Sequence, residues 1–102
     1  MPYIDQKTRE ILNEQINTLA ELISQASFNE RDIAGLLNYS CTTLAMKTVK
    51  KRCGRIRYWT IALVTGVFKN ISDEFYRRVA VPYEDNKIDD NGDIDVYKED
   101  NE

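Results

Sequence analysis

Large apolar residues repeat at helical spacing along residues 57–80, and this repeat constrains the fold more than any other feature of the chain. One line advances in steps of three and four residues, as in a helix–helix seam: Ile61, Val64, Phe68, Ile71 and Phe75. A second line lies roughly opposite, at about 100° per residue: Trp59, Leu63 and Val67. We expect this helix to self-associate; the alternative is that the other helices of the chain cover both faces.

Two more helices are predicted before this one. The first follows a cap at Asp5 and runs to about Gln25, with an apolar stripe at helical spacing. Residues 27–30, "SFNE", have the pattern of a capping box, which predicts a second helix from about residue 30 to residue 52, ended at Gly54. Pro82 is expected to end the third helix. The predicted fold class is all-α: a compact three-helix domain.

Charge is segregated along the chain. The formal net charge is −3 over residues 1–30, +7 over residues 31–80 and −7 over residues 81–102. We therefore divide the chain into a helical domain, residues 1–82, and an acidic C-terminal arm, residues 83–102. Within the arm, "NG" predicts a turn and the alternating "DIDVY" predicts a short strand or an extended segment. The arm could lie against the basic middle of its own chain or of a neighbouring copy, or stay solvated.

Composition narrows the possible functions. The chain has no histidine, the commonest general base near neutral pH, so we expect no enzymatic activity and no cofactor. Cys41 and Cys53 on one helix would be roughly 18 Å apart, too far for a disulfide. No apolar run approaches ~20 residues and the N-terminus lacks a signal-peptide pattern. We expect a cytoplasmic protein that does not enter a membrane.

Residues 87–98 resemble a calcium-binding loop in part. With Gly92 at the sixth position, the first and twelfth positions hold Lys87 and Lys98, where such a loop needs carboxylates. We therefore predict no metal site.

A basic and aromatic segment at residues 47–59, "KTVKKRCGRIRYW", could bind nucleic acid through phosphate contacts and stacking. Cations in the last turn of a helix also interact favourably with its dipole, and the whole chain is acidic. Nucleic-acid binding is kept as a lesser alternative.

Arg77 and Arg78 stand side by side near the end of the third helix. Arg78 falls on the seam, at the position where an apolar residue was due after Phe75. An arginine there should meet a carboxylate or an anionic ligand, because an unpaired buried charge is costly. The partner could be Glu84, Asp85 or another acid of the arm, or a phosphate held in a shielded crevice between helices, with Tyr76 and Tyr83 beside it.

Four motifs carry a resemblance: "MPYI" at 1–4, "LLNY" at 36–39, "EFYRRV" at 74–79 and "PYEDNKIDDNGDI" at 82–94. They resemble a family of small proteins from phages, prophages and prokaryotes that carries only an unknown-function label. The resemblance implies a compact, mostly helical protein in which "LNY", "YRR", "YED" and "NGD" form one unit, and it implies no catalytic residues. By analogy of size and side chains, the sequence is also similar to small oligomeric phage proteins that sequester nucleotide immune signals.

These observations lead to one functional expectation. We expect a non-enzymatic homo-oligomer that sequesters a phosphate-bearing nucleotide, with arginines on phosphate and tyrosines on base or sugar. The expected ligand-binding residues are Asn38, Tyr39, Tyr76, Arg77, Arg78, Tyr83, Glu84, Asp85, Asn91 and Asp93. The alternative from another class is a protein–protein inhibitor or adaptor that docks through the acidic arm.

Overall fold

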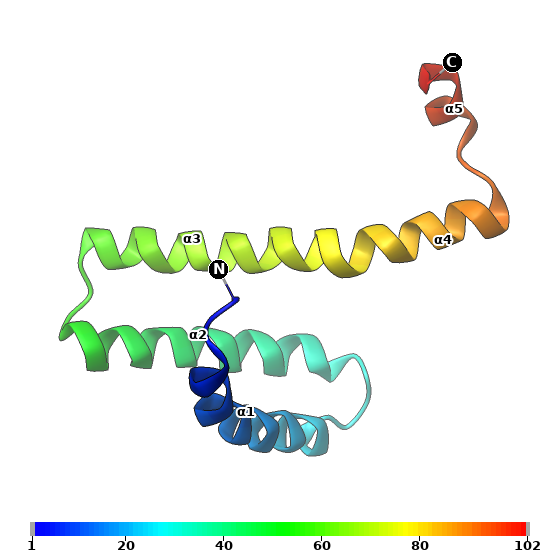
Figure 1. Cartoon of the computed structure of the whole chain (residues 1–102). Helices are drawn as coiled ribbons and strands as arrows, with labels where there is room; N and C mark the ends of the chain where they lie inside the picture. The colour runs from blue at the N-terminus through cyan, green and yellow to red at the C-terminus, as the bar shows by residue number, and fades with distance from the viewer. Residues whose placement is uncertain (1, 102) are drawn as a thin grey trace. The chain divides into compact units, whose positions relative to one another are not determined.

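The computed structural model describes residues 2–101, with side chains as far as residue 99, and confirms the all-α class. Its elements are α1 (Gln6–Ala26), α2 (Asp32–Cys53), α3 (Tyr58–Phe75), the π-helical segment η1 (Tyr76–Ala80), α4 (Val81–Asn91) and α5 (Asp95–Asn101) (Figure 1). No strand occurs among the described residues. The chain divides within α3 into two units, an N-terminal unit, Met1–Val64, and a C-terminal unit, Thr65–Glu102, which we describe separately.

The start of α1 is as the sequence predicts. The Asp5 carboxylate accepts a 2.9 Å hydrogen bond from the backbone N–H of Thr8, which satisfies one of the free donors of the first turn. At the other end, the Ser27 N–H donates to the carbonyl groups of Ile23 and Ser24.

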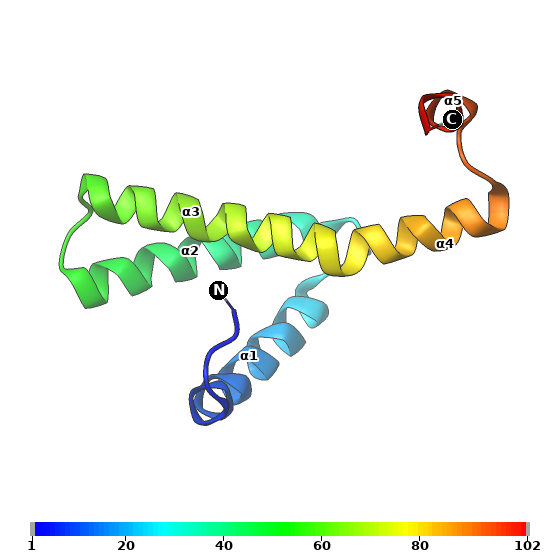
Figure 2. The ribbon, with the colours of Figure 1, turned by 45° about the horizontal axis from the view of Figure 1, so that its top comes forward.

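The predicted capping box at residues 27–30 is wrong. Instead, the Asp32 carboxylate accepts hydrogen bonds from the backbone N–H groups of Phe28 (3.0 Å) and Asn29 (3.2 Å), while the Ser27 hydroxyl donates to the Asn29 carbonyl. The aspartate thus holds the connection that precedes it, and α2 begins at Asp32 rather than near residue 30. In Figure 2, α1 and α2 diverge from this connection.

The N-terminal unit has a very small core at the turn from α2 to α3. Gly54 adopts φ +86° and donates its N–H to the Lys50 carbonyl at 2.9 Å, which ends α2 as predicted. Val49 and Thr60, 8% and 1% exposed, are the buried residues among those described. The Thr60 hydroxyl accepts from the Arg57 N–H at 2.8 Å and donates to the Arg57 carbonyl at 2.7 Å.

In the C-terminal unit, helix continues through Pro82, so the prediction that this proline ends the third helix is wrong. Figure 1 shows α3 running directly into α4. The five-residue η1 lies just before the proline. The proline ring has no N–H and would clash with the carbonyl four residues back, and the wider π turn relieves both problems by moving the hydrogen-bond pattern one residue further back.

The predicted strand or extended segment at "DIDVY" is also replaced by a helix, α5. It follows the break at Gly92, whose φ of +83° ends α4. The predicted arm is therefore helical over most of its described length, and α4 crosses the predicted boundary between residues 82 and 83.

Both apolar faces of α3 are open to solvent. On the seam, the exposed fraction is 54% for Ile61, 56% for Ile71 and 63% for Phe75. On the opposite line, Trp59 and Leu63 are about half exposed. None of the described helices is both long and apolar enough to cross a lipid bilayer.

Candidate functional site

The structure divides the ten predicted ligand-binding residues between the two units. Asn38 and Tyr39 lie on α2 in the N-terminal unit, so the "LNY" motif belongs to a different unit from "YRR", "YED" and "NGD". The other eight lie between residues 76 and 93 of the C-terminal unit. The candidate site described here is the surface formed by these eight residues and their neighbours.

The first part of the site is η1, which contains Tyr76, Arg77 and Arg78. The Val81 N–H donates to the Tyr76 carbonyl, five residues back, where an α-helix would use the carbonyl four residues back. One turn therefore holds an extra residue, and the line of the seam passes from Phe75 toward Val79 and Ala80. Arg78 lies off the line on which a regular helix would place it.

Arg77 is held by its own helix. Its guanidinium donates a 2.6 Å hydrogen bond to Oε1 of Glu74, three residues earlier. The Arg77 side chain is 64% exposed and that of Glu74 only 28% exposed. Because a guanidinium carries five N–H donors, this contact fixes the group while leaving other donors free for an anion.

Arg78 is exposed and makes no ion pair with any described residue. Tyr76 and Tyr83, 55% and 61% exposed, present aromatic surface on η1 and on the first turn of α4. Both arginines are exposed, so the shielded crevice expected around them is not formed within the C-terminal unit.

The second part of the site is a hollow of about 350 Å³ at the junction of α4 and α5. Glu84, Asn91 and Asp93, three of the predicted residues, line it. The remaining lining residues are Lys87, Ile88, Gly92, Ile94 and Tyr97. Apolar side chains of both helices thus lie beside carboxylate, amide and ammonium groups, a mixture that suits a small polar ligand with an apolar part.

Two local contacts shape this hollow. The Lys87 ammonium lies 5.5 Å from the centre of the Tyr83 ring, a cation–π contact across one helical turn. The Asp93 carboxylate accepts a 2.7 Å hydrogen bond from the Ile94 N–H as the chain enters α5. The calcium-like residues 87–98 are divided among α4, the connection that follows it and α5, and no described group of three Cys, Asp or Glu side chains could hold a metal ion.

A family model for a domain of unknown function, DUF6899, matches residues 1–94. The chain belongs to this family. The matched range contains α1 to α4 and all ten predicted ligand-binding residues of this DUF6899 chain, whereas α5 lies beyond it. No curated protein and no solved structure matches the chain.

Sequence reasoning missed three residues at the site of this DUF6899 chain: Glu74, Lys87 and Tyr97. Helical spacing contained a signal for the first two, because Glu74 is three residues before Arg77 and Lys87 is four residues after Tyr83. No such signal exists for Tyr97, which reaches the hollow only because α5 is a helix.

The basic segment of the DUF6899 chain, residues 47–59, spans the end of α2, the turn and the start of α3. Its six cationic side chains are exposed: Lys47, Lys50, Lys51, Arg52, Arg55 and Arg57. Nucleic-acid binding by this segment stays a prediction.

Proposed function

We propose that the protein is a non-enzymatic, homo-oligomeric binding protein that sequesters a phosphate-bearing nucleotide signal at η1 and the first turns of α4. Copies associate through α3. Arg77 and Arg78 bind phosphate oxygens, and Tyr76 or Tyr83 stacks on the base. Glu84, in the first turn of α4, accepts a hydrogen bond from a sugar hydroxyl. Asn91 follows Arg78 by about 20 Å along the helix, so Asn91 and Asp93 do not contact the same small nucleotide.

The arrangement of the two arginines carries this proposal. Arg77 is fixed by Glu74, and the neighbouring Arg78 has no carboxylate partner among the described residues. A planar guanidinium can form two parallel hydrogen bonds to phosphate, which a lysine cannot do. The flanking tyrosines add rigid aromatic surface at low entropic cost. π-Helical turns inside α-helices occur frequently at functional sites, which agrees with this position although Pro82 suffices to explain the turn.

Exposure of apolar side chains supports the oligomeric part of the proposal. The described apolar core consists of Val49, and no residue between 65 and 99 is buried. A soluble chain does not leave two lines of large apolar side chains in water along one helix, since such patches mark interaction sites. A second copy that covers α3 could also provide the shielding that the arginines lack within the C-terminal unit.

The test is a screen by thermal unfolding and native mass spectrometry. The ligands are cyclic dinucleotides, cyclic ADP-ribose variants and mononucleotides, each well above micromolar concentration. At a hundredfold excess over Kd, binding adds about 2.7 kcal/mol, which raises the Tm of a chain this size by roughly 10 °C or more. The double variant Arg77→Ala/Arg78→Ala should lose the shift. Lys50→Ala/Lys51→Ala, which removes equal charge elsewhere, should keep it.

If no nucleotide in the screen raises the Tm of the wild-type protein, nucleotide capture is rejected. If the lysine variant loses the shift as fully as the arginine variant, binding depends on general positive charge and the site assignment is wrong.

One observation favours a second candidate function, protein–protein inhibition through the acidic arm. The arm is helical and exposes Ile88, Ile94 and Val96 beside its acids, as in helices that dock into apolar grooves of partners. Deletion of residues 94–102 separates the two functions. Under this candidate, affinity for an identified partner protein falls sharply while nucleotide shifts and subunit number stay unchanged. If the deletion leaves partner affinity intact, this candidate is rejected.

A further inference from the structure

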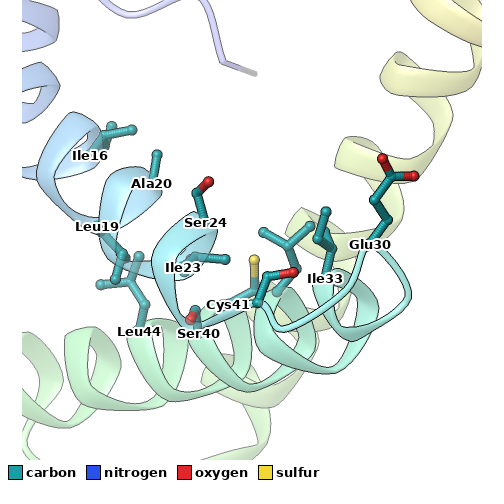
Figure 3. Close-up of a pocket in the computed structure, with 12 residues that line it drawn as sticks. Ile16, Leu19, Ala20, Ile23, Ser24, Glu30, Ile33, Ser40, Cys41 and Leu44 are labelled. Atoms are coloured by element: carbon teal, nitrogen blue, oxygen red, sulfur yellow. The ribbon is translucent and has the colours of Figure 1, made fainter.

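An apolar groove lies between α1 and α2 in the N-terminal unit, separate from the candidate nucleotide site. Its volume is about 540 Å³. Figure 3 shows side chains of both helices lining it, with Glu30 near one end. Aliphatic side chains form most of the lining, including Ile16, Leu19, Ile23, Ile33, Leu37 and Leu44. Ile16 and Leu44 are 56% and 59% exposed, so the helices leave each other's apolar faces largely uncovered.

The size of the groove indicates what could fill it. A cavity of about 150 Å³ lined by Leu, Ile and Phe holds one benzene-sized group, so this groove has room for three or four large side chains. Along α2 the lining extends from Ile33 to Leu44, about 16 Å at 1.5 Å per residue. The groove itself contains no aromatic residue. Its occupant is therefore expected to be about three turns of a helix that presents large side chains on one face.

The α3 seam meets these requirements. Ile61, Val64, Phe68 and Ile71 form four large side chains over about 15 Å of one helix, and Phe68 adds the aromatic volume that the groove lacks. Ridges of side chains at such three- and four-residue spacing pack into the groove between helices of another segment.

Among the lining residues the charged one is Glu30, near one end of the groove. Cationic residues flank the seam at both ends, Arg55 and Arg57 before it and Arg77 and Arg78 after it. Opposite charges at the rims of two apolar surfaces favour their association and fix their register.

The described N-terminal unit does not fill the groove with its own α3, because no α3 residue lines the groove and Ile61 on the seam is 54% exposed. One α1–α2 pair offers one groove. If it held the seam of its own chain, Trp59, Leu63 and Val67 on the opposite line would still be exposed. Reciprocal insertion between copies would cover the groove and the seam of both chains.

We propose that the α1–α2 groove binds the α3 seam of a second copy of this chain. This inference rests on the self-association in the proposed function and adds the surface against which α3 packs.

Cys41 lines the groove and provides a native probe. In full-length protein with Cys53→Ser, one thiol at a time is introduced by Ile61→Cys, Val64→Cys, Phe68→Cys or Ile71→Cys. Successive seam positions are about 5 Å apart and a disulfide spans Cα atoms within about 7 Å, so at least one variant must bridge if the seam occupies the groove. The control is Ala62→Cys, an exposed position at least about 100° from every one of these seam residues. Circular dichroism checks the helicity of each variant.

Mild oxidation should give a covalent dimer whose bridge joins Cys41 of one chain to the introduced thiol of the other, at one or more seam positions and not at position 62. Adding Cys41→Ser should abolish it. A bridge within one chain would overturn the inference, because the groove would then hold its own α3. A Cys41–Cys41 dimer in the Cys53→Ser protein would overturn it in favour of groove-to-groove pairing. An oligomer by native mass spectrometry with no bridge at any position refutes the groove while leaving self-association intact, whereas a monomer refutes both.

Discussion

The Arg77 guanidinium donates a 2.6 Å hydrogen bond to Glu74, whereas Arg78, the next residue, has no carboxylate partner among the described residues. The two arginines are therefore not equivalent, although the sequence places them side by side. Part of the positive charge of Arg77 is offset by Glu74, and Arg78 retains its full charge for a ligand or a neighbouring copy.

This difference predicts unequal effects on nucleotide affinity. Arg78→Ala should lower affinity about 10- to 100-fold, the effect of losing one or two charge-assisted hydrogen bonds of roughly 1.5–3 kcal/mol. Arg77→Ala should lower it less, because Glu74 already competes for that guanidinium. Isothermal titration calorimetry with the nucleotide found by screening measures both. A larger loss for Arg77→Ala than for Arg78→Ala would contradict the assignment.

If Pro82 causes the π turn, the variant Pro82→Ala should lose that turn. Alanine restores an N–H and removes the ring clash, so η1 should relax to an α-helix and gain about 1 kcal/mol from the recovered hydrogen bond. Hydrogen exchange of amides near residues 78–86 should slow. Nucleotide affinity should fall, because Arg77 and Arg78 rotate relative to Tyr83. Val81→Ala keeps the proline and serves as the control; equal exchange in the two variants would show that Pro82 does not maintain the turn.

The fold was predictable where a local signal decides the backbone. Asp5 can accept a hydrogen bond from the first turn of a helix, and Gly54 can adopt the positive φ that ends one, whatever the rest of the chain does. The prediction that Pro82 ends the helix was wrong because a shift of the backbone hydrogen bonds one turn earlier lets the helix continue. That shift depends on backbone geometry and not on residue type. In "DIDVY" five residues are too few to separate a period of 2 from one of 3.6.

The site was less predictable for a different reason. The three-residue spacing of Glu74 and Arg77 was enough to predict their ion pair. Regular helical spacing also placed Arg78 on the seam, and this was wrong because the π turn moves Arg78 off that line. No pattern in the sequence specifies whether the arginines are shielded, and in the C-terminal unit both are exposed.

Replacing either of two glycines of the N-terminal unit by alanine should change the stability in opposite directions. Gly54→Ala forces a side chain into φ +86° and should lower the free energy of unfolding by about 1–3 kcal/mol. Gly35 lies within α2 with nothing within 4 Å of an added methyl group, so Gly35→Ala should raise that free energy by up to about 1 kcal/mol. Urea unfolding at fixed protein concentration compares the variants. A loss of stability in Gly35→Ala would show that a second copy packs against this position.

Variants of Thr60 measure how much the buried turn between α2 and α3 contributes to the free energy of unfolding. Thr60→Val keeps the shape but leaves the Arg57 N–H without the hydroxyl that accepts from it, at a cost of about 1–3 kcal/mol. Thr60→Ser keeps the hydroxyl and loses one methyl group, about 0.8 kcal/mol. In urea unfolding, the free energy of unfolding should be highest for the wild type, lower for Thr60→Ser and lowest for Thr60→Val. Equal values for Thr60→Val and the wild type would show that packing alone holds this turn.

Asp5 predicts a pH dependence at the start of α1. Hydrogen bonds from Thr8, through its hydroxyl and then its backbone N–H, lower the pKa of the Asp5 carboxyl below its ordinary value of 3.8. A carboxyl whose pKa is lower in the folded state stabilises that state above its unfolded pKa, and the contribution is lost as the pH falls through the folded pKa. Asp5→Asn still caps the helix but does not titrate, and it lacks the charge that interacts with the helix dipole. Wild type should therefore have the higher Tm at pH 6, and the difference from Asp5→Asn should shrink toward zero below pH ~3.8. A difference that stays constant from pH 6 to pH 2.5 would show that the charge of Asp5 has no part in holding the first turn.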